Sequence, residues 1–232
     1  MTDPIFIKLK NGLVVSCQAE AGSPFNSPEG VKLFAEAAVL GGAVGIRSEG
    51  IKKTAAIINA VNIPVIGLVK TKFEDGTVCI TGSTKSVNDL IEIKSNIIAI
   101  DGTFRLREKL TGPEFIKKIK NDLNPIIMAD VSTLEEGLEC AEAGADCIST
   151  TLSGYTPETK NKYAAGPDFE LVENLVAKLS IPVFAEGRIN TPADAARMIE
   201  LGAWGVVAGT AITRPNIITE WYVREIAKSV KK

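Results

Sequence analysis

Short apolar segments recur along the chain at intervals that suit strands alternating with helices. Eight such runs occur, at residues 13–17, 43–46, 64–69, 97–100, 126–129, 147–150, 182–185 and 205–208. Hydrophobicity is almost continuous within each run, which is typical of strands that are covered on both faces. Because the intervening stretches carry helical periodicity, the pattern predicts a parallel sheet built from repeated strand–helix units.

Two of the intervening helices have well-marked starts. Thr133 is followed three residues later by Glu136, the spacing of a capping box. Thr191 precedes Pro192, and proline is favoured at the first helical position. These signals place helix starts just after the fifth and seventh apolar runs, which supports the strand–helix alternation.

Eight strand–helix units in 232 residues predict an α/β fold, a (β/α)8 TIM barrel, as a single domain over residues 1–232. A doubly wound open sheet is the alternative. It is less favoured because no G-x-G-x-x-G follows the first strand and no run has the features of an edge strand.

Ionisable side chains follow two of the apolar runs directly: Lys70 follows the third and Glu186 the seventh. The carboxyl ends of parallel strands are where such folds assemble active sites, so both residues are candidates for proton transfer. Each also has a simpler interpretation. Lys70 could be a solvated residue, and Glu186 could be an ion-pair partner of Arg47 or Arg188.

Other strand ends contribute further polar groups to the same edge: Gln18, Arg47, Asp101, Asp130, Thr150, Thr151 and Gly209. Burying such groups destabilises a fold unless they pair, so some of them are expected to form a network. Asp130 could instead only cap the following helix. The loop after the sixth run, which includes Thr151 and Tyr155, is rich in hydroxyls suited to a sugar.

Composition excludes several kinds of chemistry and of partner. With a net charge of −2, we do not expect the protein to bind nucleic acid or an anionic membrane. No apolar stretch is long enough for a membrane span. Because the chain has no histidine, any proton transfer must use Lys, Glu, Asp, Tyr or Cys, and a catalytic zinc site is not expected. The cysteines lack CxxC spacing and the N-terminus lacks signal-peptide features, so we expect a cytoplasmic protein.

A turn of small residues follows the last apolar run. Gly209 and Thr210 in this turn, together with Gly187 after the seventh run, offer backbone N–H groups to an anion. Many barrels build a phosphate site from their last two loops, and Arg214 adds a charged donor. The other interpretation is a tight turn required only for packing.

Motifs at nearly every strand end together resemble the N-acetylmannosamine-6-phosphate 2-epimerase family. They are residues 13–18 (LVVSCQ), 42–47 (GAVGIR), 66–70 (IGLVK), 149–156 (STTLSGYT), 185–188 (AEGR) and 211–215 (AITRP). The resemblance implies a (β/α)8 barrel that interconverts N-acetylmannosamine 6-phosphate and N-acetylglucosamine 6-phosphate in sialic acid degradation. It also implies that no cofactor or metal is needed.

The resemblance further implies roles for individual residues. Lys70 and Glu186 would be the proton-transfer pair, and Gln18, Arg47 and Asp130 would contact the sugar or position Lys70. The phosphate would lie against Arg214 and the backbone donors of Gly187, Gly209 and Thr210. Relatives usually have Arg and Pro where this chain has Thr71 and Glu108. The roles of Arg105 and Arg107 are left open.

Inversion at C2 requires a proton to leave one face and another to return to the opposite face, hence two groups. Lys70 must then be partly neutral near pH 7, through desolvation or a neighbouring cation such as Arg47, while burial raises the pKa of Glu186.

Two alternatives stay open: a class I aldolase with a Schiff base on Lys70, and a non-catalytic barrel that binds a sugar phosphate. A homodimer is also considered, although the chain alone does not decide it.

Overall fold

Eight parallel strands close into a barrel in the computed structural model, which describes residues 3–230 apart from the side chains of residues 163–165. The order around the barrel is β1-β10-β9-β8-β7-β6-β3-β2. These strands are β1 (Leu13–Ser16), β2 (Gly45–Glu49), β3 (Val65–Leu68), β6 (Ile97–Asp101), β7 (Ile127–Asp130), β8 (Cys147–Ser149), β9 (Val183–Glu186) and β10 (Gly205–Ala208). Each overlaps one of the eight apolar runs, so the predicted (β/α)8 barrel is confirmed.

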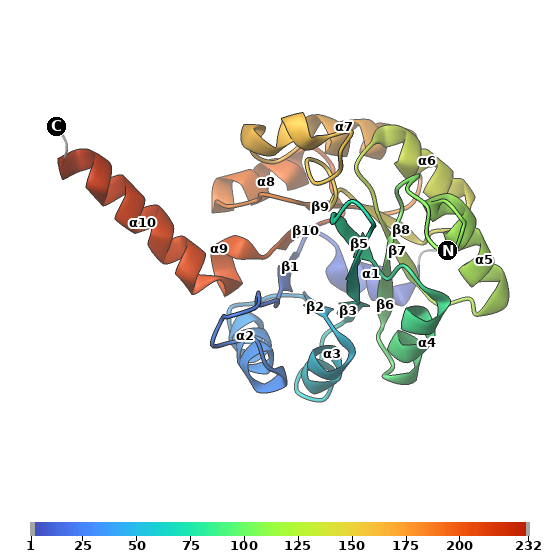
Figure 1. The fold of residues 1–232 in the computed structure, drawn as a ribbon, viewed down its shortest axis with the longest axis horizontal. Helices are drawn as coiled ribbons and strands as arrows, with labels where there is room; N and C mark the ends of the chain where they lie inside the picture. The colour runs from blue at the N-terminus through green and yellow to red at the C-terminus, as the bar shows by residue number, and fades with distance from the viewer. Residues whose placement is uncertain (1–2, 231–232) are drawn as a thin grey trace.

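Helices follow most strands and cover the outside of the barrel (Figure 1). They are α2 (Pro28–Leu40), α3 (Ile51–Ile58), α4 (Thr84–Glu92), α5 (Gly112–Asp122), α6 (Leu134–Glu142), α7 (Phe169–Lys178) and α8 (Pro192–Glu200). Both marked starts are confirmed, because Thr133 and Glu136 form a capping box on α6, and Thr191 and Asp194 form one on α8. Of the short segments, α1 (Pro4–Leu9) precedes β1, η1 (Lys160–Ala165) lies between β8 and α7, and α9 (Thr210–Thr213) follows β10.

The barrel has two apolar layers, and successive residues of a strand alternate between them. Along β6, Ile97 packs into the barrel interior, whereas Ile98 packs into the layer between strands and helices. Met128 of β7 and Phe184 of β9 also belong to the interior cluster. This period of two decides which strand-end side chains point into the barrel.

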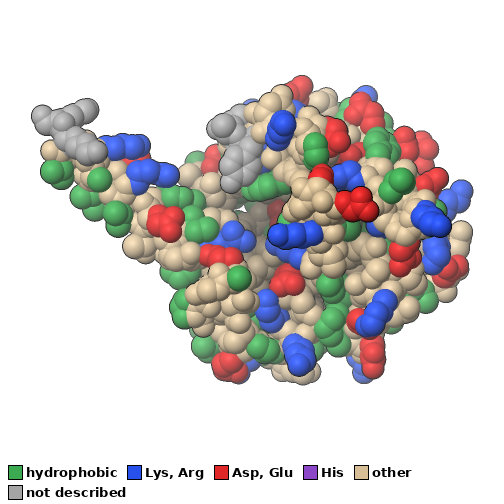
Figure 2. Space-filling model, viewed as in Figure 1, with side chains coloured by type: hydrophobic (Ala, Val, Ile, Leu, Met, Phe, Trp, Pro, Cys, Tyr) green, Lys and Arg blue, Asp and Glu red, His purple; other side chains and the backbone are tan. Residues whose placement is uncertain are grey.

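Two features of the fold lie outside the pattern of eight strand–helix units. A hairpin of β4 (Lys70–Lys72) and β5 (Val78–Ile80) follows β3 directly, and Lys70 is its first residue. The last helix, α10 (Pro215–Val230), projects away from the barrel and has no buried residue (Figures 1 and 2). No helix within residues 3–230 is long and apolar enough to cross a bilayer.

Candidate active site

Strand periodicity directs charged side chains into the mouth of the barrel. Asp130 lies two residues after Met128 on β7, and Glu186 lies two residues after Phe184 on β9, so each follows an interior residue with the same orientation. Arg47 on β2 follows Ile46, which packs toward the helices. The three charged groups therefore meet inside the barrel, at the carboxyl ends of its strands.

Arg47 is the centre of this cluster and pairs with two carboxylates at once. Its Nη1 and Nη2 donate to the two oxygens of Asp130 at 3.0 and 2.5 Å, and Nη1 also lies 2.9 Å from Glu186 Oε2. The Arg47 and Asp130 side chains are 1% and 0% exposed, and that of Glu186 is 14% exposed. The expected paired network is thus present. Of the partners considered for Glu186, Arg47 is the one in ion-pair contact.

Asp130 serves this ion pair and does not cap the helix that follows it. The N-cap of α6 is Thr133, whose side chain accepts from the backbone N–H of Glu136. Asp130 instead receives the bidentate contact from Arg47. Burial alone would lower the pKa of Arg47, but the carboxylates of Asp130 and Glu186 raise it, so the guanidinium stays charged.

Glu186 is held at the boundary between this buried pair and the open mouth of the barrel. Its Oε2 lies 3.0 Å from the Thr151 hydroxyl and 3.4 Å from that of Ser149, and both hydroxyls are positioned to donate. Burial raises the pKa of Glu186 and the Arg47 guanidinium opposes this, while the Asp130 charge raises it further. Burial therefore favours the protonated form of this carboxyl, the direction that the sequence predicts.

Lys70 approaches the same space from the hairpin. Its Nζ donates to Gln18 Oε1 at 2.6 Å, and Gln18 Nε2 donates to the Ser16 hydroxyl at 3.0 Å. Lys70 as a whole residue is exposed at the barrel mouth, yet its amino group lies against Gln18, which is only 9% exposed. Desolvation of the amino group lowers the pKa of Lys70, and the cations Arg47 and Arg214 lower it further. Both expected causes of a lowered lysine pKa are present.

A cavity of about 440 Å³ brings most of the sequence-predicted site residues together. Its lining includes Gln18, Lys70, Thr151, Tyr155, Glu186, Gly187, Gly209, Thr210 and Arg214. Arg47 and Asp130 lie beneath the cavity and not on its wall, since both are buried and paired with each other. The position of these two side chains allows them to act on Glu186 more readily than on a bound molecule.

One end of this cavity carries the small residues expected to receive an anion. Gly187 has a φ of +111°, a left-handed conformation that favours glycine. A Cβ on Gly209 would lie 3.1 Å from the Ser16 side chain, so the turn after β10 is tight. Arg214 lies at the same end, with its Nε 3.5 Å from Glu20 Oε2. The tight-turn interpretation of these glycines is therefore correct in part and leaves their anion-binding role open.

Tyr155 and Arg188 contact each other in the lining of the cavity. The Arg188 guanidinium lies over the Tyr155 ring, 5.6 Å from its centroid, and donates to the carbonyl oxygens of Gly166 and Ser153. Arg188 thus braces the loop after β8. Tyr155 is 44% exposed, so its ring is accessible to a molecule entering the cavity.

Several lining residues had no signal in the strand-end pattern, above all those of the β4–β5 hairpin. Gly76, Thr77, Val78 and Ile80 line the cavity beside Lys70. The dipeptide Asp75-Gly76, flanked by short segments of strand-forming residues, is the signal that could have revealed this hairpin. Within residues 3–230, no cluster of three or more His, Cys, Asp or Glu side chains could hold a metal ion.

Comparison with known proteins agrees with this geometry. Residues 31–228 match the family NanE, described as "Putative N-acetylmannosamine-6-phosphate epimerase". Two relatives named "Putative N-acetylmannosamine-6-phosphate 2-epimerase" come from Caldanaerobacter subterraneus and Clostridioides difficile. The first is 48% identical, covering 94% of this chain and 92% of its own, and the second is 46% identical, covering 94% and 97%.

A solved structure extends the comparison to three dimensions. The N-acetylmannosamine-6-phosphate 2-epimerase from Clostridium perfringens superposes with a TM-score of 0.88 at 38% identity, over 97% of both chains. Sequence and structure therefore agree over nearly the whole length of the protein, and the chain belongs to the NanE family.

Proposed function

We propose that this protein interconverts N-acetylmannosamine 6-phosphate and N-acetylglucosamine 6-phosphate by removing and returning a proton at C2. The hydrogen at C2 is acidic only when C1 is a carbonyl, so the reacting form is the open-chain sugar. The pathway we propose is sialic acid degradation, as the family implies. The reaction needs neither a redox cofactor nor a metal.

The observation that carries this proposal is that Lys70 and Glu186 face one cavity from different sides of the barrel mouth. Lys70 belongs to the hairpin after β3, and Glu186 ends β9. Desolvation lowers the pKa of the amine and raises that of the carboxyl, so their pKa values move toward each other. A pair of this kind carries one proton in total, so one group can take a proton from a carbon between them while the other group supplies one to it.

The remaining site residues support this pair in the proposed reaction. Gln18 orients the Lys70 amino group through the 2.6 Å hydrogen bond. Arg47 and Asp130 set the position and charge of Glu186 from below. The Thr151 hydroxyl lies 3.0 Å from Glu186 and 2.8 Å from Asp130, so its one proton can be donated to either carboxylate, and Tyr155 borders the sugar.

The phosphate is proposed to bind at the end of the cavity formed by Gly187, Gly209, Thr210 and Arg214. Backbone N–H groups and a guanidinium are suitable donors for a dianion. Binding the phosphate away from C2 would hold the sugar while the proton moves, so that its binding energy contributes to catalysis.

A homodimer is proposed because the last helix and the barrel each leave an apolar surface uncovered. Tyr222, Ile226 and Val230 of α10 recur every four residues on one side and are 69%, 63% and 81% exposed. Meanwhile a groove of about 400 Å³ runs beside β1, β10 and α8, and includes Leu13, Ala196 and Ile199. This is the outer face of the last strand, which a helix covers in a complete barrel.

We propose that α10 of a second copy lies in this groove, and that α10 of the first copy lies in the groove of the second. Such a symmetric exchange of α10 uses the same two surfaces on each chain and buries both at once. A cytoplasmic location is also proposed. It is supported by four free cysteines, all of them buried, which suit a reducing compartment.

The direct test of the active-site assignment is to remove each proton-transfer group separately. We expect Lys70→Met and Glu186→Gln to lower kcat for N-acetylmannosamine 6-phosphate by a factor of at least about 100. The matched exposed variants Lys85→Met and Glu200→Gln should keep normal turnover. Near-normal activity in both site variants would refute the assignment. Trapping of substrate on Lys70 with borohydride would instead reveal Schiff-base chemistry.

A further inference from the structure

The β4–β5 hairpin forms one wall of the active-site cavity and also carries Lys70. Its strands pair antiparallel from Lys70 opposite Ile80 to Lys72 opposite Val78. The base of the hairpin is closed by Val69 and Thr81, where Thr81 N donates to Val69 O at 2.7 Å. The tip, residues 73–77, is closed by two backbone hydrogen bonds of its own, from Phe73 N to Thr77 O and from Gly76 N to Phe73 O, both at 2.9 Å. A contact outside the hairpin fixes where this tip lies against the barrel.

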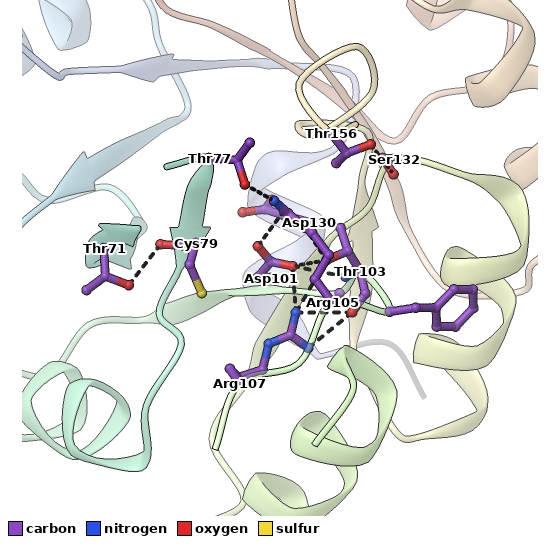
Figure 3. A network of polar contacts seen from close by, with 12 residues as sticks. Thr71, Thr77, Cys79, Asp101, Thr103, Arg105, Arg107, Asp130, Ser132 and Thr156 are labelled. Carbon is purple, nitrogen blue, oxygen red and sulfur yellow. Dashed lines mark hydrogen bonds and ion pairs between the residues drawn. The ribbon is translucent and has the colours of Figure 1, made fainter. Parts of the chain in front are cut away.

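That contact is made by Arg105, in the loop after β6 (Figure 3). Its Nη1 donates to the Thr77 hydroxyl oxygen at 2.8 Å, and its guanidinium lies over the Phe73 ring at 4.2 Å from the centroid. A hydrogen bond and a cation–π contact thus hold the two ends of the hairpin tip. Thr77 in turn donates to Asp75 within the tip, at 2.5 Å.

The other side of Arg105 is anchored in the barrel. Nη2 lies 3.1 Å from Asp101 Oδ2, and Nε donates to the Thr103 hydroxyl at 3.0 Å (Figure 3). Asp101 ends β6 and is completely buried. The planar guanidinium therefore joins a buried strand end to the tip of the hairpin through groups with fixed directions.

Arg107 shares Asp101 with Arg105 but has a different place in the structure. Its Nη2 donates to Asp101 Oδ1 at 2.8 Å and to the Thr103 carbonyl at 3.1 Å, and its side chain is only 3% exposed. With Arg105 removed, Asp101 keeps Arg107 and the Thr103 donors, so its buried charge stays paired. Loss of Arg105 should therefore loosen the hairpin tip, which keeps only the longer contact of Arg107 with the Phe73 ring at 5.9 Å, and leave the barrel folded.

We propose that Arg105 is a positioning residue for the epimerase reaction: it fastens the β4–β5 hairpin to Asp101 and so keeps water from the amino group of Lys70. This inference rests on the proposed role of Lys70. Gly76, Thr77 and Val78 of the fastened hairpin line the cavity that Lys70 faces. When the tip moves away, that wall opens and the amino group becomes better solvated.

The consequence for Lys70 has a definite sign. Desolvation is the largest cause of its lowered pKa, and the charged groups around it are Arg47, Arg214, Glu186 and Glu49. None of these four groups lies on the hairpin, so they remain in place when the tip is released. Better solvation alone then raises the pKa of Lys70, and the alkaline limb of the kcat profile moves to higher pH.

The experiment compares Arg105→Ala with Arg197→Ala, an exposed arginine of α8 that pairs with Glu200. Hydrogen exchange is measured for hairpin amides of residues 71–80, together with kcat and KM across pH for N-acetylmannosamine 6-phosphate. For Arg105→Ala we expect hairpin exchange about tenfold faster, kcat about tenfold lower with KM within about twofold, and an alkaline limb at higher pH. Arg197→Ala should match the wild type, and Thr77→Val should reproduce part of the Arg105→Ala effect.

Two results would overturn the proposal. Unchanged hairpin exchange in Arg105→Ala would show that the arginine does not fasten the hairpin. Faster exchange with an unchanged pH profile would show that fastening has no effect on Lys70. Failure of the proposed function is distinguishable, because Lys70→Met would then retain turnover whatever the exchange rates of Arg105→Ala.

Discussion

The Arg47 guanidinium lies 2.9 Å from the Glu186 carboxylate while it also holds Asp130 through both of its terminal nitrogens. A single buried cation thus pairs with a structural carboxylate and with the candidate catalytic one. The arrangement couples stability to catalysis, since any change at Arg47 alters the charge balance around both groups.

We expect Arg47→Met to destabilise the fold by about 3–5 kcal/mol, because the fully buried Asp130 would lose its counter-ion. A urea titration of the variant measures this loss. Adding Asp130→Asn to Arg47→Met should restore part of it by removing the unpaired charge. Equal stability of the Arg47→Met variant and the wild type would show that the ion pair has no structural role.

The pH dependence of kcat should be bell-shaped, because the active pair carries one proton on either Lys70 or Glu186. The acid limb reports protonation of both groups. It should lie above pH 4.5, the ordinary pKa of a glutamate, since the pKa of Glu186 is raised. The alkaline limb reports loss of the last proton and should lie below pH 10.5, since the pKa of Lys70 is lowered. Limbs at the ordinary values would contradict the shifts.

Arg214 should contribute mainly to binding of the phosphate group. We expect Arg214→Ala to lower kcat/KM by about ten- to a hundredfold, the usual effect of losing a charged hydrogen bond. Glu20→Gln is the matched control, since Glu20 pairs with Arg214 at 3.5 Å outside the proposed phosphate contact. Its kcat/KM should be unchanged or higher. A fall in both variants would indicate a structural role for the pair.

The exposed stripe on α10 should determine the oligomeric state. We expect the wild-type protein to sediment as two chains of 24.7 kDa each, and the double variant Tyr222→Asp/Ile226→Asp to sediment as one. Lys228→Glu, which changes the charge of the same helix outside the stripe, should remain dimeric. A monomeric wild type would contradict the exchange of α10.

Much of the barrel and part of the site follow from the period of two within the strands. Met128 and Phe184 fix the inward orientation of β7 and β9, so the positions of Asp130 and Glu186 two residues later could be predicted. The distinction between lining and buried groups could not be predicted, because Arg47, which follows the second apolar run, has the same sequence signature as a group that contacts substrate. Only the packing shows that carboxylates enclose it.

The hairpin and the last helix show why other features could not be predicted. Lys70 follows an apolar run, and the short polar strand that it begins contains no alternation long enough to identify. The apolar stripe of α10, with Tyr222 and Ile226, is the same whether the helix covers its own barrel or another chain. In both cases contacts between distant residues decide the structure.

The measurement that tests the central claim most directly is proton NMR of the reaction in heavy water. N-acetylmannosamine 6-phosphate is converted by the wild-type protein, and the C2 position of the first product formed is examined. If Lys70 and Glu186 remove and return the proton from opposite faces, the N-acetylglucosamine 6-phosphate formed carries deuterium at C2. Product that keeps its original hydrogen there, in a reaction where the enzyme's protons exchange freely with solvent, would contradict the account.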